Sequence, residues 1–392
     1  MEKLNRKIFI TLFFSLFSTV TGVGIVVPLL PVYAHSLGAG GIYIGLIFGA
    51  FAISRTLFLP YFGRWSDRRG RKPFIVAGLL AYSVISFVFV LSETVESLIA
   101  IRFVQGIASA MIMPVIQAYV GDITPDGSEG FSMGLFNTSV FWGLSLGPLM
   151  GGVIKDYFSL DAAFISMGVL SFIGCVLSIF SLPPTRNEIG ATDPNEPEPW
   201  MPLLRDKEMA GLFLFRLTFT ICIGIIWGFL PVFADTQCSL SSASIGILIM
   251  LGVFVAGLMN TPMGWLADRV DRKAMVMVGG IVVGCAIVSL EWARGFWALF
   301  VANLFFGLGG GIAMPALMAL AVIKGNQAHA MGSVMSLLTM GHSLGMMSGA
   351  LLAGLMMDYL LLQHAFAAGA LIMGIGVVLF YLLMAGYGNG GK

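Results

Sequence analysis

The sequence GRWSDRRGRK, at Gly63–Lys72, returns about 200 residues later as GWLADRVDRK, at Gly264–Lys273. The sequence LPVYA, at Leu30–Ala34, returns at a similar offset as LPVFA, at Leu230–Ala234. Repetition over such a long period indicates two copies of one structural unit. In membrane proteins built from duplicated halves, the binding site lies between the halves. The repeat therefore predicts two related bundles with a cavity where they meet.

The composition is that of a membrane protein. Hydrophobic residues make up 58% of the chain, charged residues only 10%, and the mean hydropathy is +0.93. In a soluble domain about a quarter of the residues are charged. Apolar runs of about 20 residues, long enough to cross the hydrocarbon core as helices, recur along the chain. The twelve predicted spans are residues 8–34, 42–62, 73–92, 97–121, 130–154, 162–182, 209–234, 243–263, 274–291, 296–323, 330–356 and 365–385.

Helices are the expected form of these spans because lipid cannot satisfy unpaired backbone groups, and the alternating pattern of a β-barrel is absent. We predict an all-α polytopic membrane protein with twelve transmembrane helices in two pseudo-symmetric six-helix bundles, residues 1–182 and 209–392. The Pro-rich, charged segment 183–208 is predicted to be a cytoplasmic linker. Most Lys and Arg residues fall on the side of the N-terminus, and the opposite loops hold only Lys155 and Arg294. Both termini are therefore predicted to be cytoplasmic.

The motif GRWSDRRGRK resembles the signature G-x-x-x-D-R-x-G-R-[RK] of the major facilitator superfamily. This resemblance implies that the loop latches the cytoplasmic ends of the two halves together when the transporter faces outward. Gly63 is expected to let a helix end pack closely on a neighbour, and Asp122 resembles the carboxylate that pairs with Arg71 in such a latch. The predicted latch residues are Gly63, Asp67, Arg68, Gly70, Arg71, Lys72, Asp122, Gly264, Asp268, Arg269 and Arg272.

Two further motifs lie in the fourth and fifth spans. RFVQG, at Arg102–Gly106, resembles the superfamily pattern R-x-x-Q-G. GLSLGPLMGG, at Gly143–Gly152, fits G-x-x-x-G-P-x-x-G-G, which marks the drug/proton antiporters of the superfamily. The resemblance implies that the glycines pack the fifth span on its partner in the other half; ordinary small-residue packing is the alternative. The residues of this predicted packing and gating motif are Gly143, Gly147, Pro148, Gly151 and Gly152.

The second half departs from these patterns. Asn303 stands where Arg102 does, and Phe306 stands where Gln105 does. The counterpart of the glycine motif keeps three glycines but lacks the proline and the last glycine. We therefore expect the fold to be retained in both halves while the polar chemistry of the fourth span belongs to the first.

None of the 20 Asp and Glu residues falls deep in a predicted span, whereas three arginines and one histidine do. A cation at the centre of a span costs a few kcal/mol, so it normally faces water or a partner. Helical spacing places three more side chains beside these cations. The candidate substrate or proton cavity contains Arg55, Arg102, Gln105, Arg216, Thr220, Trp227 and His342. The alternatives are that Arg55 and Arg216 snorkel to the inner surface and that His342 is a core histidine.

These features predict a secondary transporter that works by alternating access and exports amphipathic or drug-like molecules in exchange for protons. The missing deep carboxylate favours an alternative cargo, an organic anion or an anionic lipid bound by the arginines. A membrane enzyme is disfavoured because the four histidines are scattered, and a pore because no filter-like loop repeats.

We expect a monomer in the bacterial inner membrane, with a small-molecule substrate, protons and the lipid bilayer as its partners. The net charge of +1 predicts no nucleic-acid partner. The four cysteines fit no metal-binding or disulfide pattern, and we expect no cofactor or metal.

Overall fold

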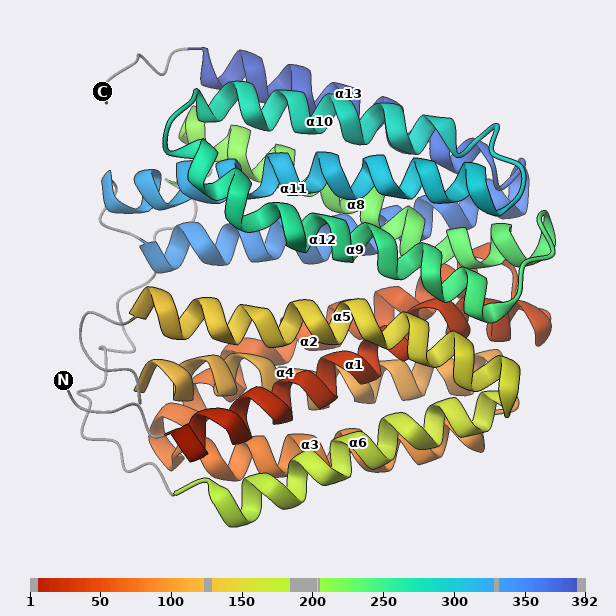
Figure 1. The fold of residues 1–392 in the computed structure, drawn as a ribbon, viewed down its shortest axis with the longest axis vertical. Coiled ribbons are helices and arrows are strands. Elements are labelled where there is room, and N and C mark those ends of the chain that lie inside the picture. The colour runs from red at the N-terminus through yellow and green to blue at the C-terminus, as the bar shows by residue number, and fades with distance from the viewer. Residues whose placement is uncertain (1–5, 123–128, 184–202, 204, 328–330, 386–392) are drawn as a thin grey trace. The chain divides into compact units, whose positions relative to one another are not determined.

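The computed structural model describes residues 6–122, 129–183, 203, 205–327 and 331–385. These residues form long helices (Figure 1), and no strand occurs among them. The helices are α1 Arg6–Ser36, α2 Gly41–Arg69, α3 Arg71–Val90, α4 Val95–Asp122, α5 Glu129–Tyr157, α6 Leu160–Ser181, α8 Lys207–Thr236, α9 Ser242–Ala267, α10 Arg272–Ser289, α11 Phe296–Gln327, α12 Met331–Tyr359 and α13 His364–Met384. A long helix is present at each predicted span, and over the described residues all of them except α5 are long and apolar enough to cross a membrane. The predicted fold class is confirmed.

The helices extend beyond the apolar runs at the ends that carry the repeated basic motif. α2 continues to Arg69, past the predicted end at residue 62, and its last turns contain the charged residues that follow the apolar run. The chain turns at Gly70, whose φ of 90° and ψ of 154° lie in a region that favours glycine. In the second half Asp271 takes this place, with an ordinary φ of −63° and a side chain that accepts a hydrogen bond from the Lys273 amide at 3.0 Å. The same turn is thus made in two ways.

The packing of the helices repeats from one half to the other (Figure 1). In the first half α1 packs against α5 and α6, and α3 packs against α4 and α6. In the second half α8 packs against α12 and α13, and α10 packs against α11 and α13. α1 and α8 are the most enclosed of the spanning helices. The sequence repeat therefore corresponds to a repeat of helix packing.

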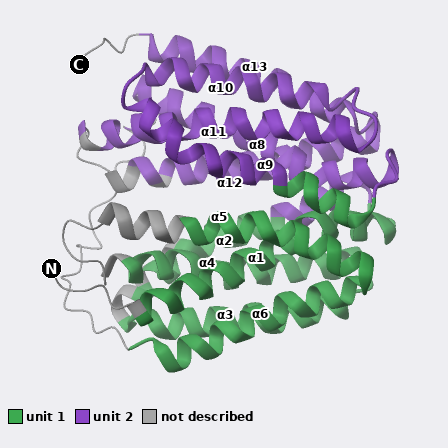
Figure 2. Ribbon diagram, viewed as in Figure 1, with its two compact units in different colours: residues 1–39, 50–193, 241–250 green, residues 40–49, 194–240, 251–392 purple. Residues whose placement is uncertain are grey.

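The chain divides into two compact units (Figure 2). One contains residues 1–39, 50–193 and 241–250, and the other contains residues 40–49, 194–240 and 251–392. Each unit thus includes the first turns of a helix whose remainder belongs to the other unit. These helices are α2, divided at residue 50, and α9, divided at residue 251. The predicted linker lies mostly outside the described residues, so its boundaries stay a prediction.

A three-charge cluster fixes the start of α8 in the second unit. Asp206 caps α8 by accepting a hydrogen bond from the Met209 amide at 3.0 Å. Lys324, near the end of α11, lies 2.8 Å from both the Asp206 and Glu208 carboxylates. Burial opposes ionisation of Asp206, but the hydrogen bonds from Lys324 and from the Met209 amide outweigh it and lower the pKa of this carboxyl.

Candidate functional site

The first unit contains a buried polar pair in α4. Arg102 donates from Nη1 to Oε1 of Gln105 at 2.7 Å, as their spacing of three residues along a helix allows. The Arg102 guanidinium also lies over the ring of Phe51 in α2, 4.3 Å from the ring centroid. Gly106 makes this approach possible, because a Cβ on Gly106 would lie 2.5 Å from the Phe51 carbonyl oxygen. The R-x-x-Q-G residues therefore work as a unit: the glycine admits α2, and α2 brings an aromatic face to the arginine.

Arg55 lies in the same unit and reaches a methionine. Its Nη2 donates to Sδ of Met113 at 3.2 Å, and its buried Nε has no hydrogen-bond partner among the described residues. A thioether is a weak acceptor, so this contact satisfies a guanidinium poorly. Met113 precedes Pro114 inside α4.

The second unit repeats this arrangement with a different arginine. Arg216 of α8 donates from Nη1 to Sδ of Met314 at 2.8 Å. Met314 precedes Pro315 in α11 and is the counterpart of Met113 in the sequence repeat. On its other side, Nη2 of Arg216 lies 3.4 Å from Nδ1 of His342 in α12. The structure thus brings together Arg216 and His342, and it gives each unit one guanidinium on the sulfur of a Met-Pro pair.

Thr220 and Trp227 complete the predicted stripe on α8. Thr220 is buried, and its Oγ1 lies 2.9 Å from the Arg216 carbonyl oxygen and 3.3 Å from that of Gly341 in α12. It therefore links two packed helices. Trp227 is half-buried.

The counterpart of the Arg102–Gln105 pair has lost its polar character. Asn303 of α11 donates from Nδ2 to the Leu299 carbonyl of its own helix at 3.1 Å. Phe306 stacks on Phe219, with ring centroids 6.1 Å apart and an interplanar angle of 9°. The divergence read from the sequence is therefore a real difference in contacts: an arginine pair in one unit and an aromatic stack in the other.

The glycines of α5 face two directions. Gly143, Gly147 and Gly151 pack on α1 of the same half, where a Cβ on Gly147 would lie 2.7 Å from Cα of Gly24. Gly152 alone of the four packs on the carbonyl of Ser242, at the start of α9. The expectation that the whole stripe packs on the other half is therefore wrong for three of its glycines. Their spacing of four residues forms one stripe, and the next residue points about 100° away from it.

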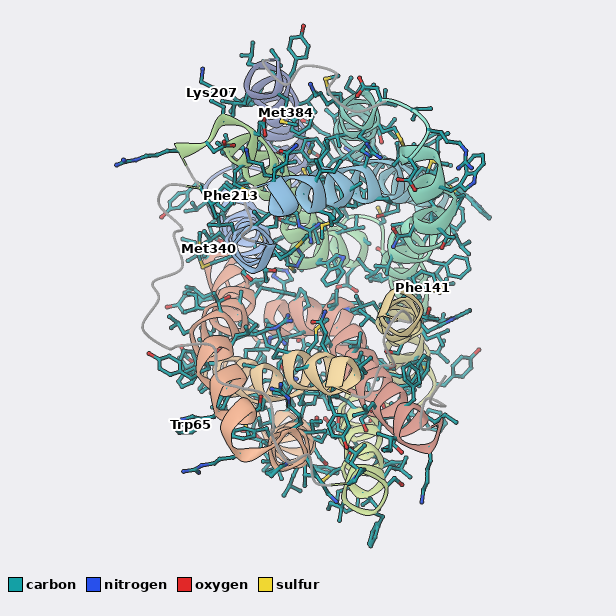
Figure 3. The ribbon with its side chains drawn as sticks, turned by 90° about the vertical axis from the view of Figure 1, so that its left-hand side faces the viewer. Trp65, Phe141, Lys207, Phe213, Met340 and Met384 are labelled. Atoms are coloured by element: carbon teal, nitrogen blue, oxygen red, sulfur yellow. The ribbon has the colours of Figure 1, made fainter. Side chains whose placement is uncertain are left out.

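The last lysine of each basic motif holds helix ends together. Lys72 donates to the Ile179 carbonyl oxygen at the end of α6, at 2.7 Å, and Lys273 donates to that of Met384 at the end of α13, at 3.0 Å. Met384 is labelled in Figure 3. A cation at a helix C-terminus is favourable because it faces the last carbonyls.

The arginines of the motif make local contacts. Arg71 is buried and donates from Nη1 to Oγ of Ser66 at 2.8 Å. Nη2 of Arg272 lies 3.4 Å from an Asp268 oxygen. Arg269 lies 3.6 Å above the ring of Trp265.

Two predictions for the motif remain predictions. A Cβ built at Gly63, or at its counterpart Gly264, meets no atom of the described residues within 4 Å, so the close packing expected at Gly63 stays a prediction. The side chains of Asp67, Arg68 and Asp122 lie outside the described part of the structure, so the pairing of Asp122 with Arg71 stays a prediction.

Sequence reasoning missed the aromatic and sulfur partners of the arginines. The Met-Pro pair at Met113 and Met314 recurs at the same offset as the basic motif, but nothing in the sequence pairs these sulfurs with Arg55 and Arg216. No spacing rule pointed to Phe51, which reaches Arg102 from another helix.

The sequence model that defines the Major Facilitator Superfamily matches residues 12–241 and 211–387 of this chain. Multidrug resistance protein 2 of Bacillus subtilis is 28% identical over 388 residues, which cover 96% of each chain. The quinolone resistance protein NorA of Staphylococcus aureus is 25% identical over 386 residues, also 96% of each. A solved structure of a bacterial homolog to the human lysosomal transporter Spinster, in an inward-facing and occupied conformation, has a TM-score of 0.79 at 14% identity and covers 98% of both chains. The chain therefore belongs to the Major Facilitator Superfamily and is an integral membrane transporter, not an enzyme.

Proposed function

We propose that this transporter works by alternating access and exports amphipathic or drug-like small molecules in exchange for protons. The observation that carries the proposal is the full-length similarity to proteins named for multidrug and quinolone resistance. The glycine-proline sequence Gly143–Gly152 supports it, because it resembles the pattern of the drug/proton antiporters. The chain has no phosphate-binding G-x-x-x-x-G-K-[ST] sequence, so the proton gradient is the energy source we propose.

In this proposal the chain is a monomer in the bacterial inner membrane, with both termini in the cytoplasm. The distribution of Lys and Arg supports this orientation.

His342 is the group we propose to carry the coupled proton. No carboxylate lies deep in the sequence of any span, and an imidazole titrates near neutral pH. Its Nδ1 lies 3.4 Å from Arg216, and a protonated imidazole and a guanidinium repel each other. Protonation of His342 would therefore break this contact. Asp122 and the substrate itself are the other proton carriers considered.

Soft and aromatic side chains favour varied apolar cargo. Met113 and Met314 lie beside the arginines, and Phe51 presents its ring to Arg102. Methionine re-packs easily around ligands of different shape, which suits a transporter of many compounds.

A second cargo class, organic anions or an anionic lipid, is favoured by one specific observation. Arg55 and Arg216 are half-buried on apolar helices, and both donate to methionine sulfur. An anionic group would be a far stronger acceptor for these guanidiniums than a thioether. The arginines would then bind the cargo directly.

Reconstituted vesicles distinguish the two cargo classes. Purified protein in proteoliposomes with an imposed pH gradient would be tested with the cation ethidium and with the anion carboxyfluorescein. We expect ethidium transport that a protonophore abolishes. Transport of carboxyfluorescein without transport of ethidium would overturn the drug-efflux proposal in favour of the second class.

Two variants test the proposed residues. His342→Gln should remove the dependence of ethidium transport on the pH gradient, and Arg216→Gln should reduce transport. Arg205→Gln is the matched control, because Arg205 is an exposed guanidinium just before α8. Wild-type coupling in His342→Gln would exclude His342 as the proton carrier.

A further inference from the structure

Two carboxylates, at corresponding positions of the two halves, cap the first turns of α9 and α2. Asp156, near the end of α5, accepts hydrogen bonds from the amides of Ser242 at 3.1 Å and Ala243 at 2.7 Å. Asp358, near the end of α12, accepts them from the amides of Gly41 and Ile42, the latter at 2.9 Å. Each capping contact lies inside one compact unit. A contact that recurs in both copies of a duplicated chain, on residues far apart in sequence, is a feature of the fold.

Backbone packing accompanies the cap on α9. A Cβ on Gly152 would collide with the Ser242 carbonyl, and a Cβ on Gly246 would collide with the Pro148 carbonyl. The first turns of α9 therefore lie directly on the backbone of α5. The carboxylate of Asp156 completes this contact by accepting from amides that a helix start leaves unsatisfied.

The same arrangement surrounds the cap on α2. A Cβ on Gly41 would collide with the Gly354 carbonyl, and a Cβ on Gly45 would lie 2.9 Å from the Ala350 carbonyl oxygen. The first turns of α2 thus lie on the backbone of α12. Both contacts are made largely between backbone atoms, with the aspartate carboxylate beside them.

The capped turns belong to the two helices that the compact units share. Residues 41–49 of α2 group with the second unit, and residues 50–69 group with the first. Residues 242–250 of α9 group with the first unit, and residues 251–267 group with the second. Asp156 therefore holds the start of α9 in the first unit, and Asp358 holds the start of α2 in the second. The rest of each helix belongs to the other unit. With the termini in the cytoplasm, these ends lie on the outer side.

We propose that Asp156 and Asp358 form an outer clamp. Their hydrogen bonds to the first amides of α9 and α2 hold the outer ends of the shared helices in place, and release of these bonds opens the transporter to the outside. This inference rests on the alternating access proposed above and not on the identity of the cargo.

Spin-label distance measurements test the clamp. Leu91 and Trp292 are counterparts in the repeat, lie in the predicted outer turns after α3 and α10, and are 79% and 68% exposed. Cysteines at these two positions, in a background where Cys238 and Cys285 are alanine, would carry the labels. Cys175 and Cys222 are buried and stay in place.

The outward-open state gives the longer distance between the labels. We expect Asp156→Ala and Asp358→Ala each to raise the ratio of the open to the closed population about fivefold, because each substitution removes a helix cap. The Asn variants keep one acceptor oxygen and should show a smaller shift. Asp161→Ala, which removes an exposed carboxylate from the first turn of α6, is the matched control and should leave the distances unchanged.

The clamp would be overturned if the double alanine variant elutes as a single folded species and its label distances are unchanged. An equal shift in the Asp161 control would also overturn it. If the double alanine variant does not fold, the double asparagine variant decides by the same criterion. The measurement needs no substrate. If the label distances shift but the protein does not transport ethidium in vesicles, the result supports the clamp and contradicts only the drug-efflux proposal.

Discussion

Replacing Gly147 by alanine tests how closely α5 packs on α1. A Cβ at this position would lie 2.5 Å from the Thr21 carbonyl oxygen and 2.7 Å from Cα of Gly24, whereas ordinary contacts begin at 3.4 Å. Both neighbours are backbone atoms of α1, so the helices must separate by a large part of an ångström. Overpacking of this kind costs about 1–3 kcal/mol, and the better helix propensity of alanine returns about 1 kcal/mol. Because backbone atoms cannot repack, the upper part of that range, about 2–3 kcal/mol, applies, and we expect a net loss of about 1–2 kcal/mol in the free energy of unfolding.

Thermal unfolding in detergent, followed with a thiol-reactive dye in the background where the accessible Cys238 and Cys285 are alanine, measures this loss. Cys175 lies buried in the same unit and becomes reactive when the unit unfolds. The expected decrease in Tm is about 1–3 °C for a chain of this size. Gly374→Ala is the matched control, because a Cβ there meets no described atom within 4 Å. Equal Tm values for Gly147→Ala and Gly374→Ala would refute the argument from backbone contact.

Three other substitutions test separate contacts. Gly70→Ala should lower the free energy of unfolding by about 1–2 kcal/mol, because φ is 90° there, and thermal unfolding would show it. Lys324→Met should cost about 1 kcal/mol. Because hydrogen bonding lowers the pKa of Asp206, the stability difference between wild type and Lys324→Met should be present above the ordinary pKa of an aspartate and disappear as pH falls through the lowered value, which unfolding at a series of pH values would measure. Arg102→Lys keeps the charge but loses the planar fork that bonds Gln105 and stacks on Phe51, so we expect vesicle transport to decrease at unchanged expression; undiminished transport would show that the fork is not required.

The fold could be predicted from the sequence because hydropathy determines which segments cross a membrane. The ends of the helices were predicted less well, as α2 shows. Its apolar run ends near residue 62, but the helix continues to Arg69 because charged residues at the membrane surface are compatible with helical backbone. What ends the helix is the backbone conformation of Gly70, which hydropathy does not report.

The candidate site was predictable only where its residues share a helix. The contact of Arg102 with Gln105 follows from their spacing, whereas the contacts of Arg55 with Met113 and of Arg216 with Met314 join different helices. Such contacts depend on how the helices are rotated and packed. A single sequence carries no record of that rotation, except where a glycine stripe shows which face of a helix approaches another backbone.

The carboxylate caps were invisible in the sequence for the same reason. Asp156 and Asp358 look like ordinary charged residues at the ends of apolar runs. Their partners are backbone amides, which every residue except proline offers, so no pattern of side chains identifies them.

The division of α2 and α9 between the compact units has a consequence for how the two halves fold. Residues 40–49 complete the unit formed mainly by the second half, and residues 241–250 complete the one formed mainly by the first. Neither half of the chain therefore contains every segment of its own compact unit. The protein severed within its linker should yield two fragments that fold only when both are present.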